Sequence, residues 1–91
     1  MSPSLLISEE GRVFKLDYEG LLAYHGGGAL AGATMGFRVM QAAAGRLAKH
    51  GAPWERQNVH IVSGHPGPGY RDAFEYVTRC VTRNRFEVNK D

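Results

Sequence analysis

Residues 24–38, which read YHGGGALAGATMGFR, constrain the fold most, because three consecutive glycines stand directly before a long helical pattern. Gly26, Gly27 and Gly28 have no Cβ, so their backbone N–H groups can converge on a ligand at the helix N-terminus. Such a terminus carries partial positive charge and binds anions. His25 adds a titratable donor or metal ligand beside the turn. The stretch predicts an anion-binding turn, with a plain flexible turn as the alternative.

The helical pattern after the turn extends over about residues 29–50 and includes a strip of small residues and one apolar stripe, formed by Phe37, Met40, Ala44 and Leu47. Gly28, Gly32 and Gly36 recur every four residues, so they lie on one face, onto which another backbone can press closely. We expect this strip to lie against a sheet, with a helix–helix dimer seam as the alternative.

Short elements precede the glycine turn. Residues 5–7 and 12–16 predict two strands joined by a Gly-containing hairpin loop, either as an edge ribbon or as a partly ordered arm. Asp17 is a suitable N-cap for a short helix over residues 18–24, which the glycines end near His25.

The second half of the chain predicts a strand, a rigid loop, a helix and a final strand. Residues 58–64 predict a central strand covered on at least one side. The loop His65-Pro66-Gly67-Pro68-Gly69 follows, and residues 70–81 predict an amphipathic helix with Asp72 in its first turn. Residues 85–89 predict the final strand.

Composition narrows the classes of function. The 91 residues form one domain, with a hairpin or arm over 1–16 and a core over 17–91, and a chain this small favours a homodimer. The net charge of +2 without a Lys/Arg block argues against nucleic acid as a partner. The single cysteine, Cys80, and a start unlike a signal peptide predict a cytoplasmic location, and no stretch is apolar enough for a membrane span.

Several short motifs resemble those of the formylmethanofuran dehydrogenase E-subunit family. Members typically carry His-Gly-His, Cys-Pro-Gly, Gly-Tyr-Arg, an Asp-Ala pair and Thr-Gly-Cys-Thr, in that order. The matching positions are His25-Gly26, Gly36-Phe37-Arg38, Asp72-Ala73 and Thr78-Arg79-Cys80. The resemblance covers about residues 16–86 and implies an α+β fold with helices packed on one face of a small mixed sheet, similar to the catalytic domain of glyceraldehyde-3-phosphate dehydrogenase. It also implies a dimer.

Family members often bind a metal, commonly zinc, through cysteine and histidine near the glycine-rich turn. This chain departs from that pattern, since Gly27 stands in place of the second histidine and the Cys-Pro-Gly and zinc ribbon are absent. His25 and Cys80 remain at matching places, and His65 supplies a third ligand if its loop lies beside the turn. The alternative is that both histidines are ordinary loop residues and Cys80 is a small buried hydrophobe.

The candidate ligand-binding residues gather near two loops that both lead into helix N-termini. They are His25, Gly26, Gly27, Gly28, Arg38, His65, Arg71 and Asp72. Together they would attract an anionic or carboxylate-bearing ligand. No P-loop, dinucleotide fingerprint or nucleophile elbow is present.

Three functions follow from these residues. The first is a dimeric binding module that holds an anionic small molecule, cofactor or metal between the His25 turn and the His65 loop. The second is a divergent metal-dependent or acid–base enzyme that uses His25 and His65 with Asp72. The third is a non-catalytic subunit of a redox complex.

Overall fold

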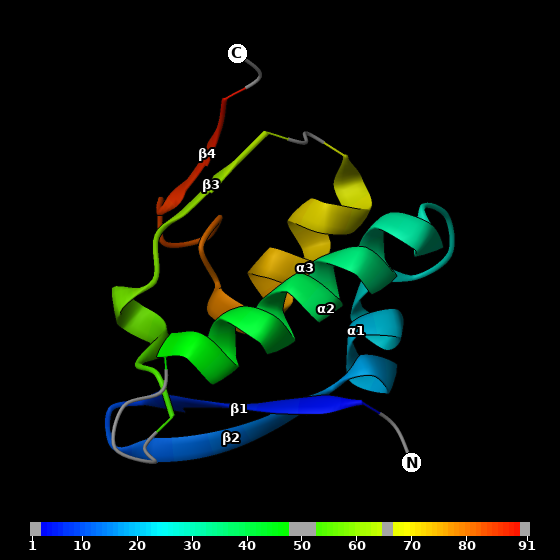
Figure 1. The fold of residues 1–91 in the computed structure, drawn as a ribbon. Helices are drawn as coiled ribbons and strands as arrows, with labels where there is room; N and C mark the ends of the chain where they lie inside the picture. Colours follow the sequence, from blue (N-terminus) through cyan, green and yellow to red (C-terminus); the bar gives the residue numbers. More distant parts are fainter. Residues whose placement is uncertain (1–2, 48–52, 65–66, 90–91) are drawn as a thin grey trace.

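The computed structural model describes residues 3–47, 53–64 and 67–89, which form a compact α+β unit with three α-helices and two separate two-stranded sheets (Figure 1). The elements in chain order are β1 (Ser4–Glu9), β2 (Arg12–Asp17), α1 (Tyr18–His25), α2 (Leu30–Leu47), the 3-10 helix η1 (Arg56–Asn58), β3 (Ile61–Ser63), α3 (Pro68–Thr78) and β4 (Phe86–Val88). The expected α+β class is confirmed, whereas the expected single mixed sheet is replaced in the described residues by one antiparallel and one parallel pair.

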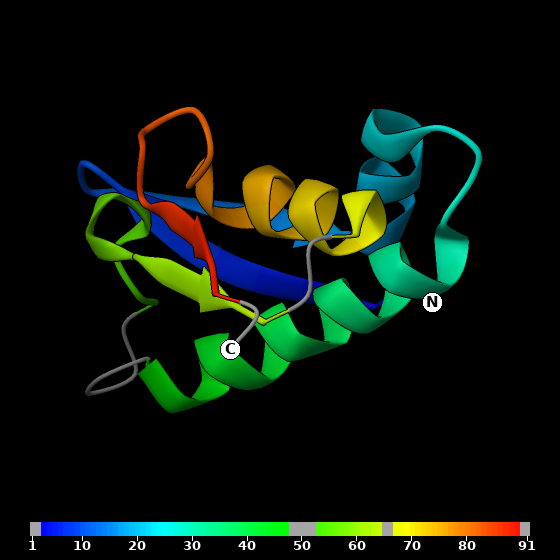
Figure 2. The same cartoon turned by 90° about the horizontal axis from the view of Figure 1, so that it is seen from above.

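The first pair, β1 and β2, forms the predicted hairpin. Glu10 and Gly11 make its two-residue turn with φ of 51° and 82°, and two positive φ values give the turn the twist that hairpins prefer. Leu5 and Ile7 point into the core, whereas Val13 of β2 faces outward. The hairpin is therefore a packed ribbon along one side of the helices rather than a loose arm (Figures 1 and 2).

The glycine strip of α2 packs on α3 of the same chain. A Cβ built on Gly36 would lie 2.7 Å from Cβ of Ala73, and one built on Gly69 would lie 2.5 Å from the carbonyl oxygen of Ala29. Real Cβ atoms do not approach this closely, so the two backbones meet only because side chains are missing on both helices. The expectation that the strip lies against a sheet is wrong, because the partner is the small-residue face of another helix. Gly28 lies outside this contact, with no atom within 4 Å of its built Cβ.

The second half of the chain forms a β3–α3–β4 unit in which the two short strands are parallel. The predicted strand over 58–64 is shorter than expected and is not central, since β3 has only three residues and pairs only with β4 in the described chain. One side of it is covered, as predicted, because Ser63 is buried and Ile61 packs against the core, whereas Val62 on the other side is 60% exposed. The residues before it turn into η1 instead, where the N–H of Val59 bonds the carbonyl of Arg56. The final strand is confirmed.

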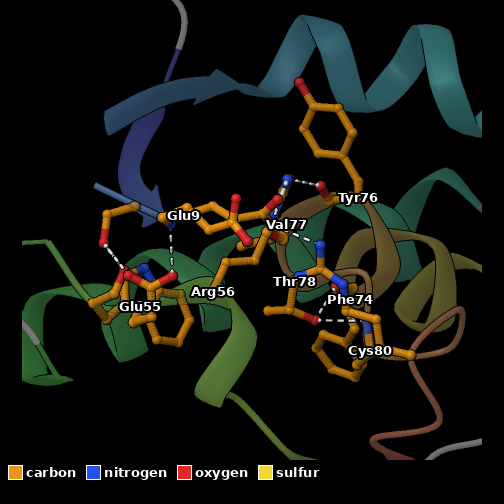
Figure 3. A network of polar contacts seen from close by, with 12 residues as sticks. Glu9, Glu55, Arg56, Phe74, Tyr76, Val77, Thr78 and Cys80 are labelled. Atoms are coloured by element: carbon orange, nitrogen blue, oxygen red, sulfur yellow. Dashed lines mark hydrogen bonds and ion pairs between the residues drawn. The ribbon is translucent and has the colours of Figure 1, made fainter. Parts of the chain in front are cut away.

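The connector after residue 52 joins the hairpin to the end of α3 (Figure 3). Arg56 donates from Nε to the carbonyl oxygen of Val77 at 2.8 Å and from Nη2 to that of Tyr76 at 3.1 Å. The last carbonyls of a helix lack partners within it and attract positive charge, so Arg56 satisfies the C-terminal end of α3. Glu55 accepts from the backbone N–H of Glu10 at 3.2 Å, which fastens the connector to the hairpin turn.

The core is formed by side chains from β1, all three helices and the connector. Its buried members are Leu5, Ile7, Leu21, Ala33, Phe37, Met40, Ala44, Trp54, Ala73, Phe74, Val77 and Cys80. The predicted apolar stripe of α2 supplies Phe37, Met40 and Ala44 to it. In the described ranges, no helix has the length and apolar character needed to cross a membrane.

The α2–α3 contact predicts opposite outcomes for two glycine-to-alanine changes. Gly69→Ala forces a methyl group into the backbone of α2 and should lower the free energy of unfolding by roughly 1–3 kcal/mol. Gly45→Ala lies in α2 where no atom is within 4 Å, so it should raise that free energy by up to about 1 kcal/mol through helix propensity. Urea unfolding followed by circular dichroism measures both, and equal effects would mean that the helices do not touch at Gly69.

Candidate functional site

The glycine turn joins α1 to α2 and leaves open space in front of it. Gly26 caps α1 with φ of 84°, and its N–H donates to the carbonyl of Leu22 at 2.9 Å. Gly28 and Ala29, the last two residues before α2, also have positive φ, of 34° and 52°. No atom lies within 4 Å of a Cβ built on any of the three glycines. The backbone of the turn is therefore accessible.

The side chain of His25 links the glycine turn to α3. Its Nδ1 lies 2.7 Å from Oδ2 of Asp72 in α3, and its Nε2 lies 2.5 Å from the carbonyl oxygen of Gly28. The imidazole side chain is only 6% exposed. A carboxylate and a carbonyl only accept hydrogen bonds, so both contacts are satisfied when each ring nitrogen carries a proton. The geometry therefore favours the imidazolium form.

The electrostatics agree with this geometry. The hydrogen bond to Asp72, followed by the bond to the Gly28 carbonyl, raises the pKa of His25 above its usual value, and desolvation opposes them more weakly. His25 also occupies the last turn of α1, where the helix dipole favours a cation.

The prediction that Asp72 lies in the first turn of its helix is wrong. Helix α3 begins at Pro68, so Asp72 lies in the second turn.

A metal ligand or a general base needs a ring nitrogen with a free lone pair. Protonated His25 has no such nitrogen, because each of its ring nitrogens donates a hydrogen bond. Either role requires that the bond to Asp72 or to Gly28 be broken. In the described part of the chain, no three His, Cys, Asp or Glu side chains come close enough to hold a metal ion. The residues present there do not fit a zinc site, and His65 lies outside the described residues.

The other predicted site residues are dispersed. Cys80 lies beyond the far end of α3, buried, with its backbone N–H bonded to Oγ1 of Thr78 at 3.1 Å (Figure 3). Burial raises the pKa of its thiol, which keeps it protonated and unreactive. Arg71 is exposed on α3, and Arg38 is exposed on α2 beside Tyr18 and Thr34 rather than at the turn.

A groove of about 350 Å³ lies where the first turns of α2 and α3 meet. We call it the glycine groove; it is lined by Ala29, Ala31, Gly32, Met35, Gly67, Pro68, Gly69 and Tyr70. It lies between the two segments that the sequence marks as loops leading into helices. Met35 and Tyr70 were not among the predicted residues, although Met35 follows Ala31 at a four-residue step and lies on the same helix face.

A scan of the chain against protein-family models matched no family, and searches of curated proteins and of solved structures found no significant match. The resemblance to the formylmethanofuran dehydrogenase family therefore remains a prediction made from short motifs.

The His25–Asp72 pair predicts a pH dependence. Below about pH 6.5 His25 is protonated in both the folded and the unfolded chain, so the contribution of the pair to the free energy of unfolding is fully present. This contribution is lost as the pH rises through the raised pKa of His25 in the folded state.

Asp72→Asn removes the charge of the hydrogen-bond acceptor and should lower the pKa of His25, measured by NMR titration of its ring protons. Glu87→Gln, which alters the exposed carboxylate paired with His60, is the control and should leave that pKa unchanged. A wild-type pKa at or below 6.5 would contradict the pairing.

Proposed function

We propose that this chain is a small binding module that holds an anionic small molecule in the glycine groove. The observation that carries the proposal is the meeting of two helix N-termini at one groove of about 350 Å³. Both termini carry partial positive charge, and the first turn of α2 also presents backbone N–H groups without helical partners. A small anion between them is stabilised by both helices, and Met35 and Tyr70 supply apolar contact for the remainder of the ligand.

His25 orients the backbone of the turn at this site rather than contacting the ligand. Its Nε2 holds the Gly28 carbonyl, and in a trans peptide the N–H points opposite to the C=O. The N–H of Ala29, which lines the glycine groove, is therefore directed away from His25. The carboxylate of Asp72 offsets the charge of the imidazolium, so protonated His25 supports anion binding by orienting the turn.

The enzyme alternative is less well supported, because His25 has no free nitrogen for proton transfer while it bonds Asp72 and Gly28. The role of a subunit in a larger complex remains compatible with a binding module, since such a subunit can carry a bound cofactor to its partner.

Inorganic phosphate is a suitable first probe of the glycine groove. We expect saturable shifts of the backbone amide signals of Leu30 and Gly32 in two-dimensional NMR. Ala31→Glu places a carboxylate at the lining of the groove on an exposed position, and should weaken phosphate binding by about tenfold or more. Ala42→Glu makes the same change at an exposed position of α2 away from the groove and should leave binding intact. Equal weakening by both variants would contradict the proposed site.

We also propose that the module is a homodimer. Val39 and Val62 are exposed and line an apolar groove of about 530 Å³ between α2 and β3, which a second copy would cover. An unprotected apolar surface of this kind is more typical of an interface than of a monomer.

Charge placed on this surface should separate the copies. Light scattering of the wild type at micromolar concentration should give twice the chain mass of 10.0 kDa. Val39→Asp should give the single-chain mass, because a carboxylate in an apolar interface loses its hydration. Val13→Asp, on the outer face of the hairpin, should remain dimeric. A wild type that scatters as one chain would refute the dimer.

A further inference from the structure

A second groove of about 360 Å³ lies on a different face of α2. It is lined by Pro3, Tyr18, Thr34, Phe37, Arg38 and Gln41, and we call it the Tyr18 groove. It shares no lining residue with the glycine groove. Its walls come from Pro3 before β1, the first turn of α1 and the middle of α2, so two of its three walls are helical.

One wall of the Tyr18 groove is aromatic. Phe37 is almost fully buried, and its ring meets that of Tyr18 edge to face with centroids 5.9 Å apart. Pro3 lies beside them, and its carbonyl accepts the backbone N–H of Tyr18 at 2.9 Å, which holds this wall in place. A flat apolar group is the natural occupant of such a surface.

The polar groups that line the Tyr18 groove include hydrogen-bond donors. The hydroxyl groups of Tyr18 and Thr34 lie 2.5 Å apart, and a bond between two hydroxyls uses one of their two protons. The other proton remains available to a ligand. Gln41 donates to the carbonyl of Ser4 at 3.0 Å, which fixes its amide at the end of the groove.

Arg38 supplies the charge. Its guanidinium is exposed, and within the described ranges it makes no ion pair with any acidic side chain. Helix α2 itself contains no Asp or Glu that would compete for it. An arginine without a partner at the rim of an apolar groove matches a carboxylate, which it can bind through two parallel hydrogen bonds.

We propose that the Tyr18 groove binds a small carboxylic acid with a flat apolar body. The carboxylate pairs with Arg38 and accepts the free hydroxyl proton of the Tyr18–Thr34 pair, and the body lies against Phe37 and Pro3. The size of the groove suits a ligand of this class, since small-molecule sites begin at about 300 Å³. This site is separate from the glycine groove and does not depend on anion binding there.

Benzoate is the probe, followed by two-dimensional NMR of the whole chain. We expect saturable shifts of the amide signals of Thr34 and Arg38 with millimolar affinity. Benzamide has the same ring without the charge, and acetate has the charge without the ring; each should bind at least about tenfold more weakly than benzoate.

The matched variants are Arg38→Met and Arg46→Met, which remove the same charge from exposed positions of one helix. Arg38→Met should weaken benzoate binding by about tenfold or more, and Arg46→Met should not change it. Unchanged melting temperatures would show that both variants fold. The proposal is overturned if benzoate produces no saturable shifts, if benzamide binds as tightly, or if the two arginine variants behave alike.

Discussion

The close approach of α2 and α3 at Gly32, Gly36 and Gly69 determines where the other elements lie. Because a Cβ on Gly69 would collide with the backbone of α2, the first turns of the two helices are in direct contact. That contact brings both N-termini to one groove and places Asp72 within reach of His25 at the end of α1. The remaining faces of α2 are then left for the hairpin on one side and for the Tyr18 groove, so both candidate sites follow from one packing geometry.

Sequence reasoning identified the elements whose signals are local. The hairpin follows from Gly11 between two apolar runs, α1 from the Asp17 cap and the glycines after His25, and the stripe of α2 from its helical spacing. The partner of the glycine strip was assigned incorrectly. Spacing on one helix shows that a backbone can approach, but the approaching residues lie more than thirty positions away and give no periodic signal of their own. The length of β3 was overestimated for a similar reason, since an apolar run does not reveal how many neighbouring strands exist.

None of the predicted ligand-binding residues that the structure describes lines the glycine groove, whereas the contact between His25 and Asp72 joins two of them. The sequence predicts both His25 and Asp72 as site residues, but the direction in which the pKa of His25 shifts depends on which neighbour is closer. A carboxylate at 2.7 Å outweighs any effect of a helix N-terminus. Arg56 received no role from sequence reasoning, because a cation in a connector has no visible relation to carbonyls twenty residues later. Arg38 was expected near the glycine turn, whereas it lines the Tyr18 groove.

The parallel pair β3–β4 has a consequence for solubility. Each strand pairs only with the other among the described residues, so both are edge strands, the kind of strand to which an extended chain can add. The strands are only three residues long, and charged or polar side chains flank them: His60 pairs with Glu87, and Arg85 precedes β4. Short length and flanking charge are the means by which natural sheets prevent edge-to-edge association. The short strands and these polar side chains therefore disfavour edge-to-edge association at this parallel pair.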